Sequence, residues 1–306
     1  MTRHVVFGTG QVGHPLVETL VARGHDVVAV NRDGQGVWPG AQVVAGDATD
    51  PGFAARVCTG ADAVYFCLNA MSYARWADEF PPLQRGARLV VLENLYAYGP
   101  PHGRTLVETM DLNPTSPKAA TRAAMTRELL AAHDAGRVEV VIGRASDYFG
   151  PGATRSALGD NVFGAALAGR TAQVMGDPDQ PHSFSYTPDV AAGLAALGTA
   201  PGVTGRAWHL PVAETRTTRD VVRAVYALAG TRPRVMAAGR TVLRAVGLVK
   251  PEVRDYLHTL YQFTDPWVVN DEALRAEVGD LSTPLDDALA ATFAWYRDRA
   301  TTAPAA

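Results

Sequence analysis

The most constraining feature of this chain is a glycine-rich loop between its first predicted strand and its first predicted helix. An apolar run at Val5–Gly8 leads into Gly8-Thr9-Gly10-Gln11-Val12-Gly13, and an apolar helical stretch, Pro15–Ala22, follows. In this order Gly8 permits a tight turn, Gly10 lets the backbone approach a pyrophosphate, and Gly13 lets the helix pack closely on the strand. The N–H groups and the positive end of that helix then hold the anion. The sequence therefore predicts a dinucleotide site formed by Gly8, Thr9, Gly10, Gln11, Val12 and Gly13.

The end of the second predicted strand indicates which dinucleotide binds. The strand Asp26–Val30 is followed by Asn31, Arg32 and Asp33. A site that prefers NAD usually places an acidic residue here for the ribose 2′-hydroxyl, whereas the planar guanidinium of arginine suits a 2′-phosphate. We therefore expect Asn31 and Arg32 to contact the cofactor, and we favour NADP over NAD. Two alternatives stay open: Arg32 is a solvated loop residue, or Asp33 turns inward in its place.

The composition restricts the class of protein. The 306 residues are 47% hydrophobic and 19% charged with a formal net charge of −3, which is typical of a globular protein with a substantial core. Arginines are scattered among acids without a basic run, which argues against a nucleic-acid partner. The two cysteines, Cys58 and Cys67, favour a reducing compartment over a disulfide framework or a zinc site. With no leader-like segment and no apolar stretch of membrane length, we expect a cytoplasmic protein that does not bind membranes.

Apolar runs alternate with helical patterns through the first half of the chain. Strands are predicted at Val5–Gly8, Asp26–Val30, Ala41–Val44, Ala63–Leu68, Arg88–Leu92 and Glu139–Gly143, and helices at Gln11–Arg23 and Lys118–Ala135. This alternation predicts an α/β fold, a Rossmann-type doubly wound parallel sheet, with ligands beyond the carboxyl ends of its strands. After Gly150 the alternation breaks down into helices and short strands. We expect an NADP-binding domain at residues 1–150, a mainly substrate-binding lobe at 151–300 that returns in part to the Rossmann core, and a flexible tail at 301–306.

Several further segments carry a resemblance to a known family. They are Gly46-Asp47-Ala48-Thr49-Asp50, Phe66-Cys67-Leu68-Asn69-Ala70, Tyr98-Gly99, Arg144–Gly152, Ser183–Ala191, Pro266–Asn270 and Ala294-Trp295-Tyr296. In content and order they resemble the extended epimerase/dehydratase branch of the short-chain dehydrogenase/reductase superfamily, over nearly the whole chain. The resemblance implies that Asp47 and Ala48 touch the adenine and that Leu68, Asn69 and Ala70 run under the cofactor. It also makes a homodimer a candidate assembly.

The catalytic positions depart from this family's pattern. The family places Tyr-x-x-x-Lys at the start of the helix after strand five, and a Ser or Thr four residues before the tyrosine of Tyr-Gly. By spacing, Lys118 stands where the tyrosine belongs, Arg122 where the lysine belongs, and Asn94 where the Ser or Thr belongs. Because all three places are altered, the family's usual proton transfer does not carry over to this chain.

Replacements for the missing acid are available among nearby residues. Arg122 stays protonated, so we expect it to grip the cofactor instead of moving protons. Lys118 is either a general acid, with its pKa lowered by Arg122 in a partly desolvated cleft, or a solvated residue of the first helical turn. Asn94 is expected to donate to a carbonyl oxygen. Tyr148 is a further candidate acid after strand six, with Asp147 beside it as a base or a turn former.

Other polar and aromatic residues favour structural roles. Both Tyr96 and Tyr98 follow strand five. In the family, the residue at the Tyr98 position packs in the core. Tyr73 and Trp76 are expected to line the substrate pocket or the core. His102 and His182 have no ligand-spaced partner in their loops, so no metal site is predicted. His209 is expected to pack or to lie at a sheet edge, and Asp189 to stabilise a helix start. Later helices are predicted at Thr217–Ala229 and Glu252–Phe263.

Two classes of function agree with these features. The first is an NADP-dependent oxidoreductase that acts on a carbonyl or alcohol of a small to medium molecule, because the cofactor site is intact. The second binds the cofactor without net redox turnover, as an epimerase, dehydratase, cyclase or NADP(H)-sensing protein, because the catalytic set is altered. We favour the first, since a sensor has less need of a substrate lobe.

Overall fold

Seven strands form the central sheet in the part of the chain that the computed structural model describes, residues 1–68, 87–249 and 257–302. Their order is β11-β6-β5-β4-β1-β2-β3, and every neighbouring pair is parallel. The strands are β1 (Arg3–Phe7), β2 (Asp26–Asn31), β3 (Ala41–Ala45), β4 (Ala63–Phe66), β5 (Arg88–Asn94), β6 (Glu139–Ala145) and β11 (Arg206–His209). The chain reverses direction along the sheet between β1 and β4, so the carboxyl ends of these strands mark the switch point where such sheets bind ligands.

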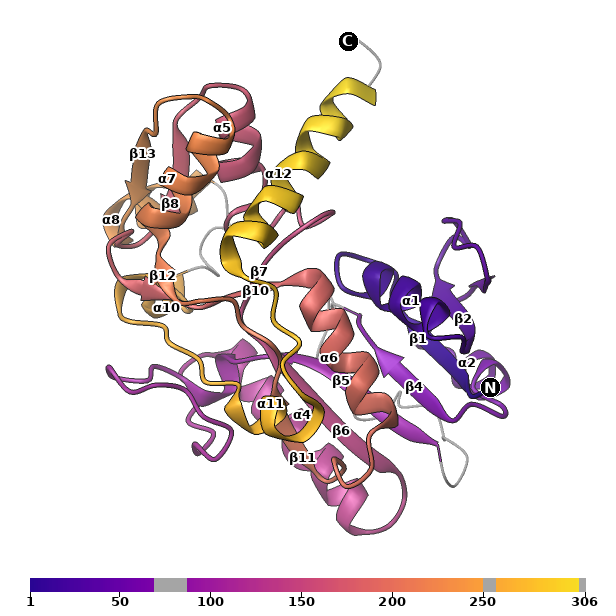
Figure 1. Ribbon diagram of the computed structural model, residues 1–306. Coiled ribbons are helices and arrows are strands. Elements are labelled where there is room, and N and C mark those ends of the chain that lie inside the picture. The colour runs from indigo at the N-terminus through magenta and orange to yellow at the C-terminus, as the bar shows by residue number, and fades with distance from the viewer. Residues whose placement is uncertain (69–86, 250–256, 303–306) are drawn as a thin grey trace.

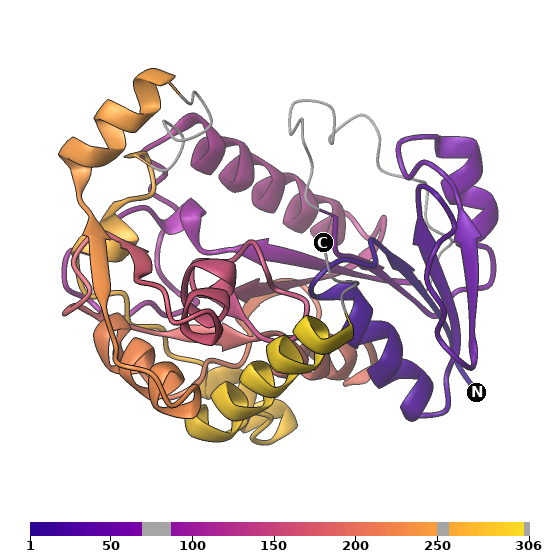
Figure 2. The same cartoon turned by 90° about the horizontal axis from the view of Figure 1, so that it is seen from above.

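Helices cover both faces of the sheet, as Figure 1 and Figure 2 show. On one face lie α1 (Gly13–Ala22) and α6 (Thr187–Thr199), and on the other lie α2 (Pro51–Val57) and α4 (Pro117–Asp134). Two of these helices begin at side-chain caps followed by proline. Asp50 accepts from the N–H groups of Gly52 and Phe53, and Ser116 accepts from the N–H of Ala119. Each cap stabilises its helix by about 1 kcal/mol, and proline fits the first helical turn without losing a hydrogen bond.

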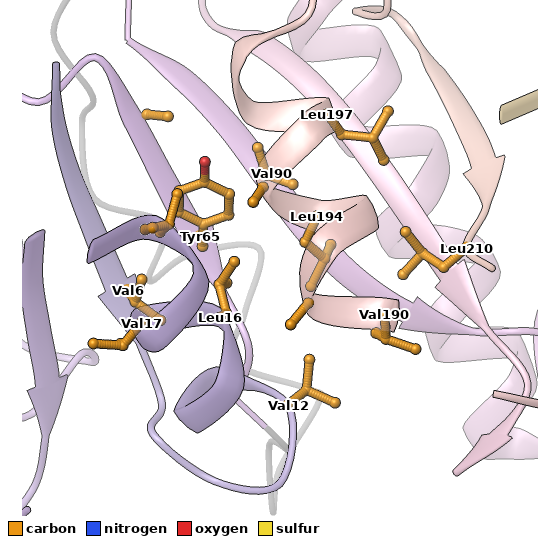
Figure 3. Packing of buried hydrophobic residues seen from close by; sticks show 14 of the residues in the cluster. Val6, Val12, Leu16, Val17, Tyr65, Val90, Val190, Leu194, Leu197 and Leu210 are labelled. Atoms are coloured by element: carbon orange, nitrogen blue, oxygen red, sulfur yellow. The ribbon is translucent and has the colours of Figure 1, made fainter. Parts of the chain in front are cut away.

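The larger core lies between the sheet and the helix pair α1 and α6 (Figure 3). Leu16 of α1 and Leu194 of α6 are fully buried, and Val6, Tyr65 and Val90 meet them from the strands. These strand residues alternate with ones that face the opposite core, because successive side chains of a strand point to opposite faces. The near-continuous apolar strands seen in the sequence follow from this burial on both faces.

The other described elements are η2 (Tyr96–Tyr98), β7 (Asp147–Phe149), a π-helix η3 (Gly159–Gly164), α5 (Ala165–Leu167), β8 (Ala172–Met175), β9 (Pro181–His182), β10 (Phe184–Tyr186), β12 (Arg216–Thr217), α7 (Thr218–Leu228), β13 (Val235–Ala238), α8 (Arg240–Val249), α10 (Tyr261–Thr264), α11 (Glu272–Val278) and α12 (Leu285–Thr302). Of these, α5, α7, β8 and β13 lie to the upper left in Figure 1, whereas α11 packs against β11 of the sheet. The pairs β7–β10 and β8–β13 are parallel, and β9–β12 is antiparallel. A separate apolar core, centred on Phe163, Val225, Leu289 and Tyr296, holds η3, α7 and α12 together.

The predicted parallel sheet is confirmed, with some boundaries shifted. All six predicted strands are present, and β5 and β6 each run two residues further than expected. The seventh strand, β11, comes from the second half of the chain. The tail prediction was wrong in part, because Thr301 and Thr302 continue α12; residues 303–306 lie outside the described part. Of the helix expected at Glu252–Phe263, residues 252–256 also lie outside it, and α10 covers only Tyr261–Thr264.

Candidate functional site

Two glycines of the glycine-rich loop are required by the protein's own packing. Gly8 has a backbone φ of +90°, and its N–H donates to the carbonyl oxygen of Val30 at 2.9 Å. A Cβ on Gly8 would lie 2.8 Å from Cδ2 of Leu68 and 2.9 Å from the carbonyl oxygen of Cys67. A Cβ on Gly13 would lie 1.7 Å from the carbonyl oxygen of Gly8. The tight turn and the close approach of α1 to the loop therefore depend on residues without a side chain.

Gly10 has a different environment from these two glycines. It is exposed, and a Cβ built on it would meet no heavy atom of the described residues within 4 Å. Helix α1 begins just beyond it, and the N-cap residue Val12 makes no side-chain hydrogen bond to the first N–H groups. An anion beside Gly10 would meet the positive end of this helix and a backbone without a Cβ. These features fit the pyrophosphate of a dinucleotide.

Asn31, the last residue of β2, connects the glycine-rich loop to the loop that follows β2. Its Nδ2 donates to Oγ1 of Thr9 at 3.0 Å and to the carbonyl oxygen of Gln35 at 2.7 Å. Its Oδ1 accepts from the N–H of Gly34 at 2.7 Å. The amide thereby positions both loops, a task that the sequence did not reveal. Contact between Asn31 and a cofactor stays a prediction.

Arg32 and Asp47 lie near one another beyond the ends of β2 and β3. The Arg32 side chain is exposed. Oδ1 of Asp47 accepts from the N–H and the hydroxyl of Thr49, both at 2.9 Å. These two bonds lower the pKa of Asp47, and the positive charge of Arg32 adds to the effect. Asp47 is thus an ionised residue that shapes its own turn, with the half-buried Ala48 next to it.

The end of β4 passes below the glycine-rich loop. Leu68 is half-buried, and its Cδ2 lies beside Gly8. Burial raises the pKa of the Cys67 thiol to about 12, so this sulfur is a packing group and not a nucleophile. The predicted contacts Asn69 and Ala70 lie outside the described residues, as do Tyr73 and Trp76.

The three altered catalytic positions fall on β5 and α4. Asn94 ends β5 and is half-buried, and its Oδ1 accepts from the N–H of Tyr96 at 3.0 Å. Arg122 is only 5% exposed on α4, although it carries a charge. Lys118 lies one turn earlier on the same helix and is exposed, which agrees with the solvated alternative for this residue. The structure therefore buries the arginine of this pair and leaves the lysine in solvent.

Tyr148 lies on β7, just beyond the carboxyl end of β6, and is half-buried. Burial raises the pKa of Tyr148, Cys67 raises it further, and the charge of Arg122 offsets part of the rise. The hydroxyl therefore keeps its proton at neutral pH. It is also close enough to Cys67 and Arg122 for both to affect its pKa, which places Tyr148 near the ends of β4 and β6 and the helix α4.

The sequence placed His182 in a loop, which was wrong. His182 lies in β9 and is 2% exposed. Its Nε2 is 3.0 Å from Oδ2 of Asp147, and its Nδ1 is 3.1 Å from the carbonyl oxygen of Gln262. Its ring stacks on that of Phe263. A signal for its burial was present in the sequence, since His182 and Phe184 share the two-residue period of a strand.

A buried ion pair supports the carboxyl ends of β5 and β6. Nε of Arg144 is 3.3 Å from Oε2 of Glu93, and both side chains are almost fully buried. The hydroxyl of Thr126 donates to the same carboxylate at 3.0 Å and accepts from Nη2 of Arg144 at 3.1 Å. These hydrogen bonds offset the cost of burying two charges, and they fix the strand end that leads into Asp147 and Tyr148.

Tyr98 and His209 form a second buried connection. The Tyr98 hydroxyl donates to Nε2 of His209 at 3.0 Å, and Nδ1 of His209 donates to the carbonyl oxygen of Asn270 at 2.8 Å. Burial lowers the pKa of His209, so the ring is neutral. Both residues are therefore structural, as expected. Asp189 lies in the first turn of α6 as predicted, and its carboxylate also accepts from the N–H and the hydroxyl of Thr283, both at 2.7 Å.

Among the described residues, no group of three or more His, Cys, Asp or Glu side chains is arranged to hold a metal ion. A search of the helices in the same ranges finds none with the length and apolar character needed to cross a membrane.

Comparison with known proteins agrees with this geometry. Residues 8–111 match the model of an NAD(P)H-binding family, and residues 83–210 match that of the NAD-dependent epimerase/dehydratase family. The two matched ranges overlap and contain the glycine-rich loop, β5, α4, β6 and α6. Residues 8–210 are thus matched, in two overlapping parts, by an NAD(P)H-binding model and an NAD-dependent epimerase/dehydratase model. The parallel sheet with helices on both faces is the Rossmann-like fold of such NAD(P)-binding domains.

Individual proteins show how broad the similarity is. A 2-alkyl-3-oxoalkanoate reductase of Stenotrophomonas maltophilia (strain K279a) is 28% identical in an alignment of 267 residues, with 76% of each chain covered. An epimerase of Methanothermobacter thermautotrophicus superposes with a TM-score of 0.81 at 16% identity, covering 98% of this chain and 93% of that one. The dTDP-glucose 4,6-dehydratase of Bacillus anthracis, crystallised with NAD, has a TM-score of 0.79 at 14% identity, covering 99% of this chain and 98% of that one. The similarity to these solved structures extends to the fold alone.

Proposed function

We propose that the protein is an NADP-dependent oxidoreductase that reduces a carbonyl group, or oxidises an alcohol, on a small to medium organic molecule. The glycine-rich loop carries this proposal. Gly8 and Gly13 are needed for packing. Packing does not explain the open space beside Gly10, nor the start of α1 without a side-chain cap. They match the needs of a pyrophosphate. The reductase relative supports redox chemistry for the bound cofactor.

The preference for NADP over NAD rests on Arg32. It follows β2 directly and is exposed, and no carboxylate occupies the neighbouring position of Asn31. A guanidinium binds phosphate oxygens in bidentate fashion, and each such charge-assisted bond contributes about 1.5–3 kcal/mol. The ionised Asp47 nearby already interacts with Arg32, so the 2′-phosphate has to compete with it for this cation. NAD remains the second choice.

The nicotinamide of bound NADPH supplies a hydride, and this chain's residues have to bind the substrate oxygen and give it a proton. We propose that the Nδ2 group of Asn94, whose Oδ1 accepts from the N–H of Tyr96, donates to this carbonyl oxygen. We propose that the Tyr148 hydroxyl, which stays protonated at neutral pH, is the acid. Lys118 is the alternative acid, and Arg122 is proposed to bind the cofactor.

A non-redox reaction is the second candidate function. The match of residues 83–210 to the epimerase/dehydratase family favours it, and the solved structures include an epimerase and a dehydratase. In such a reaction the cofactor would be regenerated in each cycle, so no net NADPH oxidation would accompany turnover.

Calorimetry with NADPH and NADH, followed by NADPH oxidation across aldehydes, ketones and enones, tests the proposal. We expect tighter binding of NADPH than of NADH, together with steady oxidation on at least one carbonyl compound. Tight NADPH binding without turnover would favour the non-redox reaction or an NADP(H) sensor. If neither cofactor binds, the proposal is wrong.

A further inference from the structure

The contact between Asp147 and His182 has no role in the chemistry proposed above, and its geometry restricts where a proton can lie. Nδ1 of His182 faces the carbonyl oxygen of Gln262 at 3.1 Å, and a carbonyl oxygen can only accept, so Nδ1 carries a hydrogen. Nε2 is 3.0 Å from Oδ2 of Asp147. A hydrogen bond at this distance needs a proton between the two atoms.

That proton belongs to either partner, and both arrangements have the same consequence. With an imidazolium the carboxylate is ionised, and with a neutral imidazole the carboxyl group is protonated at Oδ2. The pair has no net charge in either state, and the second oxygen of Asp147, Oδ1, is an acceptor in both. No described residue makes a hydrogen bond to Oδ1.

Asp147 lies at the ligand-binding edge of the sheet. Asp147 begins β7 directly beyond the carboxyl end of β6, and its side chain is 19% exposed while that of His182 is 2% exposed. Asp147 is close enough to the hydroxyls of Tyr148 and Tyr261 to contribute to the rise in their pKa values. The accessible end of the pair, Asp147, therefore lies near tyrosines of both β7 and α10.

We propose that the Asp147–His182 pair is a substrate-recognition site that requires a hydrogen-bond donor, such as a hydroxyl group, on the substrate and disfavours an anion. A hydroxyl donates to Oδ1 and satisfies it. A carboxylate or phosphate has no proton to offer, and its oxygens would face an acceptor oxygen of Asp147. This inference rests on the proposed function for its substrate class, a carbonyl compound with a neighbouring hydroxyl.

The test compares two compounds of equal chain length, 1-hydroxyoctan-3-one and 3-oxooctanoate, which differ only in whether a hydroxymethyl group or a carboxylate terminates the chain. Binding to the NADP⁺ complex is measured by calorimetry, and NADPH oxidation is measured in parallel. We expect at least tenfold tighter binding and a tenfold higher kcat/KM for the hydroxyketone. Equal or opposite preference would overturn the inference, even in the unmodified protein.

The variant Asp147→Asn then tests whether this residue causes the preference for the hydroxyketone. In this variant the preference for the hydroxyketone over 3-oxooctanoate should fall about tenfold, through a change in KM and not in kcat. Its NADPH affinity should stay unchanged. Asp177→Asn is the matched control, because Asp177 is an exposed acid in a turn where it accepts from Gln180. Undiminished discrimination in Asp147→Asn would overturn the inference. Binding of the hydroxyketone without NADPH oxidation would contradict the reductase function and leave the recognition site supported.

Discussion

Alanine substitutions at Gly10 and Gly13 should separate cofactor binding from folding within a single loop. At Gly13 the new Cβ would lie 1.7 Å from the carbonyl oxygen of Gly8, so two backbone segments have to separate by more than about 1 Å. Overpacking of this kind costs about 1–3 kcal/mol, and the rigidity of both partners argues for the upper end. At Gly10 the Cβ meets no described atom, and the lost flexibility of the unfolded chain should stabilise the protein by about 0.4–1 kcal/mol.

The assay is thermal unfolding together with NADPH calorimetry on both variants. For a chain of this size 1 kcal/mol shifts Tm by about 2 °C. Gly13→Ala should therefore lower Tm by about 6 °C, and Gly10→Ala should leave it unchanged or raise it by up to about 2 °C. Gly10→Ala should weaken NADPH binding by at least about tenfold, or 1.4 kcal/mol. Unchanged NADPH affinity in Gly10→Ala would refute the placement of the pyrophosphate, and a large loss of Tm there would refute the open space.

Four further predictions concern other parts of the chain. Arg32→Glu should weaken NADPH binding by about tenfold or more and NADH binding far less; equal losses in calorimetry would contradict the NADP preference. Tyr148→Phe should lower kcat by about 10²–10⁴ if this tyrosine is the acid, while Lys118→Met should leave it near normal; the reverse result would transfer the role to Lys118. Asn94→Ala should raise KM or lower kcat at unchanged NADPH affinity, and no change in either would exclude it from the site. Burial lowers the pKa of His4 from 6.5 to about 4, so between these values the unfolded chain binds a proton that the folded chain does not. The unfolding free energy should therefore fall as the pH drops from 7 to 5, by about 1–2 kcal/mol after allowance for solvent screening. Urea titrations at both pH values measure this loss of stability. If the His4→Gln variant loses as much stability as the unmodified protein, His4 is not its cause.

Much of the cofactor side of the protein could be predicted from local sequence. The glycine spacing, the strand before it and the helix after it are adjacent in the chain, so the geometry of Gly8 and Gly13 follows from local packing alone. The parallel sheet was predictable for a related reason, because strands buried on both faces are apolar at nearly every position. The burial of Arg122 and the exposure of Lys118 were not predictable, since they depend on how α4 is rotated against the sheet.

The sequence by itself determined the Rossmann-type sheet, the glycine-rich loop and the absence of the family's usual catalytic residues, because each depends on residues within a short stretch of chain. Only the tertiary structure decided which polar groups meet. His182 reaches Asp147 across 35 residues, and Tyr98 reaches His209 across 111. Such pairs form where separate strands end side by side, and nothing in the local period of either segment specifies the partner. For this reason the sequence predicted the fold but not the proposed recognition site.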